Sequence, residues 1–182
     1  MVDQAGRTGM TQHIAPRQAE RCAILADVSG SMLASTGSKS RIDVLRGVFA
    51  QIRSEFSGFR LIAFSTIPLE LLPHAPIPEP SGGTALHLAL DMVRRHEPER
   101  IAVLCDGVPD DPDAALSSAK LLQCHIATYF CGDDMDHAAI AFMRALAWCS
   151  ADGIGSTTVV DMKKPARLKA GLQLLLAGPA VT

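Results

Sequence analysis

From residue 22 onward, short apolar runs of strand length alternate with segments in which apolar residues recur at helical spacing. The apolar runs cover residues 22–26, 59–65, 67–72, 101–105, 125–131 and 157–160. The first helical segment places Ile42, Leu45, Phe49, Ile52 and Phe56 on one face. Alternation of this kind predicts an α/β sandwich of three layers, built on a doubly wound, mainly parallel six-stranded sheet.

The connection between the second and third runs is too short for a helix. Only residues 65–66 separate them, so these two strands are expected to be antiparallel, with residues 67–72 at an edge. The proline-rich stretch 73–80 that follows cannot join a central ladder. Three later helices are predicted from the same spacing: one with Leu86, Ala89, Leu90 and Val93, one with Ile140, Met143, Leu146 and Ala147, and one after Pro165 with Leu168, Leu172 and Leu175.

Composition bounds the size and class of the protein. The 182 residues fit one domain; residues 1–20 are polar without periodicity and are expected to form a flexible N-terminal arm, with the domain spanning 21–178. The net charge of -2 argues against nucleic acid as a partner. Nothing resembles a membrane span or a secretion signal. The five cysteines form no Cys-x-x-Cys pair, which argues against disulfides or zinc and favours a reducing, cytoplasmic location.

Oxygen-bearing side chains follow the first apolar run at alternate positions. Asp27, Ser29 and Ser31 stand where a buried strand should break into a loop. A carboxylate together with neutral hydroxyls suits a hard divalent cation such as Mg²⁺. The alternative is a polar turn in which Asp27 or a serine caps the next helix.

Two later stretches carry the same chemistry. Gly82 and Gly83 allow close backbone approach, and Thr84 follows where a helix should begin, so its hydroxyl is either a ligand or an N-cap. The apolar run 101–105 then ends in Asp106. Asp27 and Asp106 can share one ion only if their strands end close together, in the crevice where the winding of the sheet reverses.

This ordered set, Asp-x-Ser-x-Ser, Gly-Gly-Thr and an apolar run ending in Asp-Gly, resembles the von Willebrand factor A (vWA) domain over residues 20–178. In that family the set is the metal-ion-dependent adhesion site, or MIDAS. All five of its positions have matching residues here: Asp27, Ser29, Ser31, Thr84 and Asp106. The resemblance implies a Rossmann-like sheet with strand order 3-2-1-4-5-6 and an antiparallel strand 3, which agrees with the short turn at 65–66.

The resemblance also implies how each ligand acts. Ser29 and Ser31 would bind the ion directly, and Asp27 would orient the shell. Thr84 and Asp106 would exchange between direct and water-mediated contact. The expected ion is Mg²⁺, with Mn²⁺ or Ca²⁺ as alternatives. Because neutral hydroxyls leave part of its charge uncompensated, the ion should favour one more anionic oxygen, which an Asp or Glu of a protein partner can supply.

The leading interpretation is therefore a metal-dependent protein-interaction module and not an enzyme. The Asp-Val-Ser-Gly-Ser-Met stretch resembles stand-alone intracellular bacterial members, which implies a multi-protein system, beside an AAA+ ATPase or in a stress cluster. One alternative is a Mg²⁺-dependent hydrolase or phosphotransferase with Asp27 as nucleophile, although Ser29 stands where such enzymes usually place a second acid. Another is a structural subunit whose site holds no ion.

Neighbouring polar residues have simpler expected roles. The acidic groups at 110–113 and 133–136 should cap and solvate helix starts, and His87 should be a half-exposed helix residue. Asp27 and Ser29 are expected to face solvent, so that replacing either by alanine abolishes ion binding and leaves the fold intact. A branched side chain at Gly83 should disturb folding more, because it restricts the backbone there.

Overall fold

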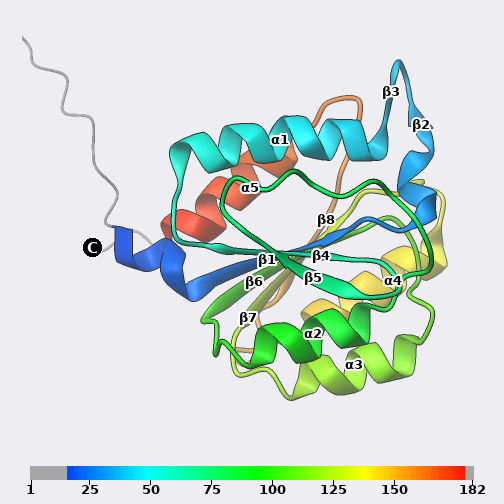
Figure 1. Cartoon of the computed structure of the whole chain (residues 1–182). Helices are drawn as coiled ribbons and strands as arrows, with labels where there is room; N and C mark the ends of the chain where they lie inside the picture. The colour runs from blue at the N-terminus through cyan, green and yellow to red at the C-terminus, as the bar shows by residue number, and fades with distance from the viewer. Residues whose placement is uncertain (1–15, 179–182) are drawn as a thin grey trace, which may run out of the picture.

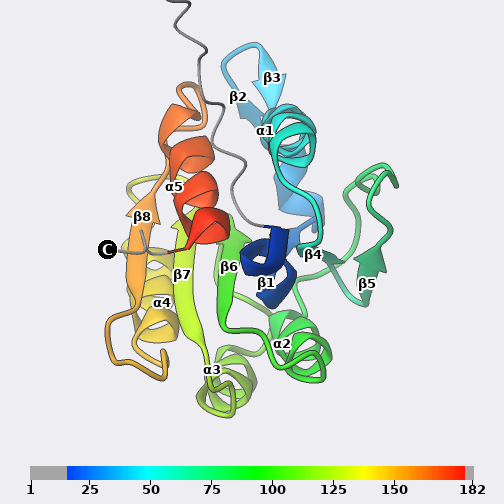
Figure 2. The ribbon, with the colours of Figure 1, turned by 90° about the vertical axis from the view of Figure 1, so that its left-hand side faces the viewer.

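The computed structural model describes residues 16–178, which form a six-stranded sheet between two layers of helices (Figure 1). The strands are β1 (Cys22–Asp27), β4 (Arg60–Phe64), β5 (Pro68–Leu71), β6 (Arg100–Cys105), β7 (His125–Phe130) and β8 (Ser156–Val159). Their order across the sheet is β5-β4-β1-β6-β7-β8, and every neighbouring pair is parallel except β4–β5. This confirms the predicted order 3-2-1-4-5-6 and its antiparallel third strand. In Figure 2, β5 and β8 lie at opposite edges of the sheet.

The α-helices cover both faces of this sheet. They are α1 (Arg41–Glu55), α2 (Leu86–Arg94), α3 (Pro112–Lys120), α4 (His137–Ala147) and α5 (Ala166–Ala177). Figure 1 shows α1 and α5 on one face and α2, α3 and α4 on the other. Two hydrophobic cores result, one on each side of the sheet. No helix in residues 16–178 combines the length and apolar character that crossing a membrane would require.

The burial of strand β1 explains why residues 22–26 are continuously apolar. All six of its residues are buried. Ala23 and Leu25 belong to the core beneath α2, α3 and α4, whereas Ile24 and Ala26 belong to the core beneath α1 and α5. A parallel strand covered on both faces has this pattern, because neither set of alternate side chains meets water.

The helical faces predicted from the sequence are the buried faces, which confirms the periodicity argument. The buried residues include Ile42, Leu45, Phe49 and Ile52 of α1, Leu86, Ala89, Leu90 and Val93 of α2, Ile140, Met143, Leu146 and Ala147 of α4, and Leu168, Leu172 and Leu175 of α5. Phe56, just after α1, is partly buried against the same core. These faces pack the helices against the sheet.

Two short elements between β1 and α1 were not predicted. A 3₁₀ helix, η2 (Gly30–Leu33), follows β1, and β2 (Ser35–Thr36) pairs with β3 (Lys39–Ser40) in a small hairpin. The hairpin turns at Gly37, whose φ of +75° is a conformation that glycine adopts without strain. In the chain, the hairpin lies directly before α1 and directly after the segment that carries Ser29 and Ser31.

The N-terminal arm predicted for residues 1–20 falls only partly within the described residues. A 3₁₀ helix, η1 (Pro16–Arg21), leads into β1, and Ala19 in it is buried. Residues 1–15 lie outside the described part of the chain.

Candidate metal centre

Three loops meet at the carboxyl ends of β1 and β6, where the winding of the sheet reverses. The first loop follows β1, the second spans 81–84 before α2, and the third follows β6 from Asp106 to Asp110. Gly30 N donates to Gly82 O at 3.1 Å, which joins the first loop to the second. Thr84 N donates to Asp110 Oδ2 at 2.7 Å and Asp110 N donates to Thr84 O at 3.1 Å, which joins the second loop to the third.

The first and third loops are joined by oxygen-bearing side chains. Ser29 Oγ and Ser31 Oγ share a hydrogen bond at 2.9 Å, and Ser31 Oγ donates to Asp106 Oδ1 at 2.7 Å. Ser29 and Asp106 are buried, whereas Ser31 is exposed. The structure thus brings three of the five predicted ligands into one connected group that opens to solvent at Ser31.

Asp27 is fully buried, with both carboxylate oxygens occupied. Oδ1 accepts a hydrogen bond from Ser29 N at 2.7 Å, and Oδ2 accepts one from the Cys105 thiol at 2.9 Å. Burial raises the pKa of Asp27 to about 6; the hydrogen bonds from Cys105 and Ser29 oppose this rise and the charge of Asp106 adds to it. Asp27 therefore lies behind the serines and orients Ser29 through its backbone.

The expectation that Asp27 and Ser29 face solvent is wrong. Their exposed fractions are 0% and 2%. The end of β1 is central in the sheet, and the second loop covers it: Ser81 N donates to Val28 O at 2.9 Å, and Gly30 N donates to Gly82 O. An alanine at position 27 would leave the Ser29 N–H without its buried partner, so this substitution should also weaken the fold.

Thr84 is held to the third loop by its backbone. It is not the N-cap of α2, since Ala85 occupies that position and no side chain caps the helix. Its N–H and carbonyl oxygen bond to Asp110, as described above. Its hydroxyl is not part of the hydrogen-bonded chain through Ser29, Ser31 and Asp106 in the described residues.

Three residues of the site were missed by sequence reasoning. Arg41, the first residue of α1, places guanidinium Nη1 2.7 Å from Asp106 Oδ2. Cys105 holds the second oxygen of Asp27. Asp110 was assigned to helix capping with its neighbours, but it is Asp111 that caps α3, by accepting from Ala114 N. A signal for Asp110 was available, because a glycine such as Gly83 permits close approach by another group.

The other polar candidates occupy the simpler roles expected of them. Asp136 caps α4 by accepting from Ala139 N at 2.9 Å, and Asp133 accepts from Met135 N at 3.0 Å in the same turn. His87 is half-buried on the first turn of α2. Within residues 16–178 no cluster of three or more His, Cys, Asp or Glu residues could hold a metal.

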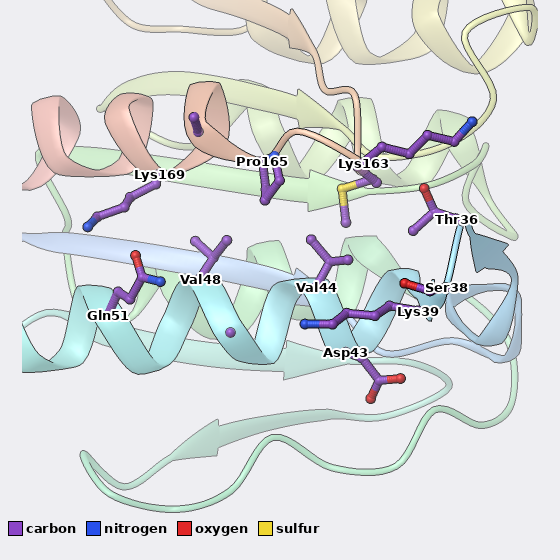
Figure 3. Close-up of a pocket in the computed structure, with 14 residues that line it drawn as sticks. Thr36, Ser38, Lys39, Asp43, Val44, Val48, Gln51, Lys163, Pro165 and Lys169 are labelled. Atoms are coloured by element: carbon purple, nitrogen blue, oxygen red, sulfur yellow. The ribbon is translucent and has the colours of Figure 1, made fainter.

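Two cavities border the β2–β3 hairpin, and Thr36 and Gly37 line both of them. One, of about 670 Å³, lies between α1 and the start of α5, with Val44 and Pro165 in its wall (Figure 3). The other, of about 550 Å³, lies by the carboxyl ends of β7 and β8 and is bordered by Arg41, Asp133 and Asp134. None of the five predicted ligands lines either cavity. The second cavity reaches the site through Arg41.

Comparison with solved structures identifies the fold. An aerotolerance-related membrane protein from Bacteroides fragilis superposes with a TM-score of 0.63 at 18% identity, covering 85% of this chain and 97% of that one. Manganese-loaded TRAP protein from Plasmodium vivax superposes with a TM-score of 0.60 at 20% identity, covering 81% and 70%. BatB, a conserved hypothetical protein from Bacteroides thetaiotaomicron, gives 0.56 at 16% identity, covering 86% and 98%.

The chain therefore has the vWA fold, as the resemblance of its motifs implied. Sequence comparison adds nothing further, since no protein-family model and no curated protein matches the chain. At these identities the likeness establishes the architecture alone.

Proposed function

We propose that this protein is a metal-dependent interaction module that binds an acidic side chain of a protein partner through a divalent cation. Ser29, Ser31 and Asp106 would hold the ion, with Thr84 beside them and Asp27 orienting Ser29 from behind. The observation that carries the proposal is the connected group of oxygens from two distant loops, at separations of 2.9 Å and 2.7 Å.

These separations fit a small divalent cation. Mg²⁺ binds six oxygens at about 2.0–2.1 Å in an octahedron, so neighbouring ligand oxygens lie about 2.9 Å apart. The Ser29–Ser31 and Ser31–Asp106 separations are close to that edge length. When bound, the cation would supply a positive centre at the exposed side of Ser31. The manganese-loaded state of the Plasmodium TRAP protein supports a divalent cation in this fold, and we propose Mg²⁺, Mn²⁺ or Ca²⁺ here.

The environment of Asp27 argues against the alternative hydrolase or phosphotransferase. A nucleophilic carboxylate must present a free oxygen to substrate. Asp27 is fully buried, and its two oxygens accept from Ser29 N and from Cys105. Turnover of a phosphate ester such as p-nitrophenyl phosphate that disappears in Asp27→Ala would reverse this conclusion.

The class of partner follows from the resemblance of the motifs to intracellular bacterial members of the vWA family. We propose a cytoplasmic protein partner within a multi-protein system, with an AAA+ ATPase or a stress-system protein as the first candidates to test. The feature to look for in such a partner is an exposed Asp or Glu on a projecting segment, because Ser31 is the open side of the site.

Mn²⁺ binding measured by electron paramagnetic resonance tests the metal site. Ser31→Ala should abolish binding, because it removes the hydroxyl that joins Ser29 to Asp106. Ser54→Ala is the matched control, since Ser54 is an exposed residue of α1 whose hydroxyl donates to Gln51 O, away from the site. Equal Mn²⁺ affinity in wild type and Ser31→Ala would refute the site.

A second measurement tests the preference for an acidic ligand. Water-proton relaxation of the Mn²⁺-loaded protein should fall when acetate is added, because a carboxylate displaces water from the ion, and should not change with acetamide. A response of the same size to both compounds would refute carboxylate recognition. Capture of the candidate partner in Mg²⁺ but not in chelator, and not by Ser31→Ala, extends the test to protein.

A further inference from the structure

Arg41 connects the start of α1 to the candidate metal centre. Its guanidinium contacts Asp106 Oδ2 at 2.7 Å, and the two side chains are only 18% and 1% exposed. The other oxygen of Asp106 accepts from Ser31 Oγ. Asp106 therefore stands between a cation on one side and the paired hydroxyls on the other.

Because of the position of Arg41 in its helix, Arg41 and Asp106 each stabilise the charge of the other. The first residue of a helix lies at the positive end of the helix dipole, where a cation is disfavoured. Arg41 is held there because its backbone N–H donates to Ala34 O at 3.0 Å. Asp106 compensates the misplaced charge of Arg41. In return Arg41 neutralises a carboxylate that would otherwise be buried without a positive partner.

A divalent cation at the serines would have to share Asp106 with this guanidinium. Two positive groups on one carboxylate repel each other, most strongly where the surroundings are shielded from water. The Arg41 side chain has space to move away from Asp106, because it borders the cavity of about 550 Å³ at the ends of β7 and β8. Asp133, Asp134 and Asp161 line the same cavity and offer it alternative carboxylates.

We propose that Arg41 is a built-in competitor of the metal ion for Asp106. It neutralises Asp106 while no ion is bound and lowers the affinity of the site for divalent cations. When an ion enters, the Arg41 side chain rotates toward the neighbouring cavity. This inference rests on the proposed function, since it requires an ion at the serines. It gives metal occupancy a consequence outside the site, because the charge lining the cavity then changes with the ion.

Mn²⁺ titration of the full chain tests the inference. Arg41→Gln should bind Mn²⁺ at least about tenfold more tightly than wild type, because it removes the competing charge. Arg41→Lys keeps the charge and should stay nearer to wild type than to Arg41→Gln. Arg46→Gln is the matched control: it removes the same charge from the same helix, but Arg46 pairs with Glu79 at 2.7 Å and with Asp43, and not with Asp106. Its affinity should stay within about twofold of wild type.

Calorimetric unfolding gives a second readout that does not depend on function. In chelator, Arg41→Gln should unfold at a lower temperature than Arg46→Gln, because it leaves Asp106 buried without its partner. Mn²⁺ should then raise the unfolding temperature of Arg41→Gln more than that of wild type.

The Mn²⁺ titration distinguishes a failure of this inference from a failure of the proposed function. If wild type binds Mn²⁺ and Arg41→Gln binds it no more tightly, the inference is refuted and the metal site stands. The inference is also refuted if Arg41→Lys binds as tightly as Arg41→Gln, since charge is then not the cause. If only Arg41→Gln binds Mn²⁺, Arg41 excludes the ion from the native protein, which refutes the proposed function and, with it, the movement of Arg41 on ion entry. Binding by neither protein refutes both.

Discussion

Gly83 lies against the Asp110 carboxylate, and this contact allows a quantitative test of how the second loop is held at the site. A Cβ at position 83 would lie 2.3 Å from Asp110 Oδ2, far inside contact distance. The same oxygen accepts the hydrogen bond from Thr84 N. Gly83 is not among the glycines with positive φ, so alanine would introduce no backbone strain there. The sequence-based reason for needing glycine, backbone freedom, is therefore replaced by a steric one.

Gly83→Ala should push the Asp110 carboxylate away and break its bond to Thr84 N. A hydrogen bond to a charged group contributes about 1.5–3 kcal/mol, and since Asp110 is exposed we expect the lower end, about 1.5 kcal/mol. Asp110→Ala should cost about the same, because it removes the same bond without a collision. The double variant should cost no more than either single variant, which gives a coupling free energy of about 1.5 kcal/mol.

Urea unfolding followed by circular dichroism, with chelator present, measures these free energies. Gly47→Ala is the control: its Cβ would meet nothing within 4 Å, and in a helix interior the substitution should stabilise by about 0.5–1 kcal/mol. Additive losses for Gly83→Ala and Asp110→Ala would show that the carboxylate does not hold the loop.

Substitutions at three further positions test other parts of the structure. In chelator, the free energy of unfolding of wild type should fall relative to Asp27→Asn as pH rises from about 4 to 7.5. The pKa of the Asp27 carboxyl is about 6 in the folded protein, against an ordinary 3.8. Its contribution to the free energy of unfolding is therefore complete below pH 3.8 and is lost as pH rises through 6, a change of about 3 kcal/mol. A difference between wild type and Asp27→Asn that does not vary with pH would contradict this. Cys105→Ala should cost about 1–3 kcal/mol by leaving Asp27 Oδ2 without a donor, whereas Cys105→Ser should recover most of that loss in the same urea assay. Gly37→Ala should cost about 1–2 kcal/mol, because the hairpin turn holds φ at +75°; a neutral effect on thermal unfolding would show that the hairpin rearranges at no cost.

The strands and their directions were predictable from local patterns, whereas their order across the sheet was implied by the resemblance to the vWA domain. The apolar run before Asp27 and the run before Asp106 identified two buried parallel strands, and the short turn at 65–66 fixed the antiparallel edge. The hairpin at 35–40 was missed because its two-residue strands are too short to show alternation.

The surroundings of the site were less predictable because they depend on contacts between distant segments. The burial of Asp27 and Ser29 comes from loops 50 or more residues away, which the local sequence does not reveal. The Arg41–Asp106 pair spans 65 positions and depends on the length of one arginine side chain. Side chains that make such contacts lack the periodicity by which strands and helices are identified.

The charges of the site explain why its proposed partner should be acidic. With Asp27 and Asp106 ionised and Arg41 paired to Asp106, these three side chains carry a net charge of -1. A divalent cation would change the total to +1 and place that charge beside Ser31, the exposed member of the group. One carboxylate from a partner restores neutrality, whereas a neutral ligand leaves the charge uncompensated and a basic one increases it. When Arg41 moves into the neighbouring cavity, its positive charge stays near the ion although it no longer contacts Asp106. Arg41→Gln removes that charge altogether, so it should bind the ion more tightly and an acidic partner less tightly than wild type.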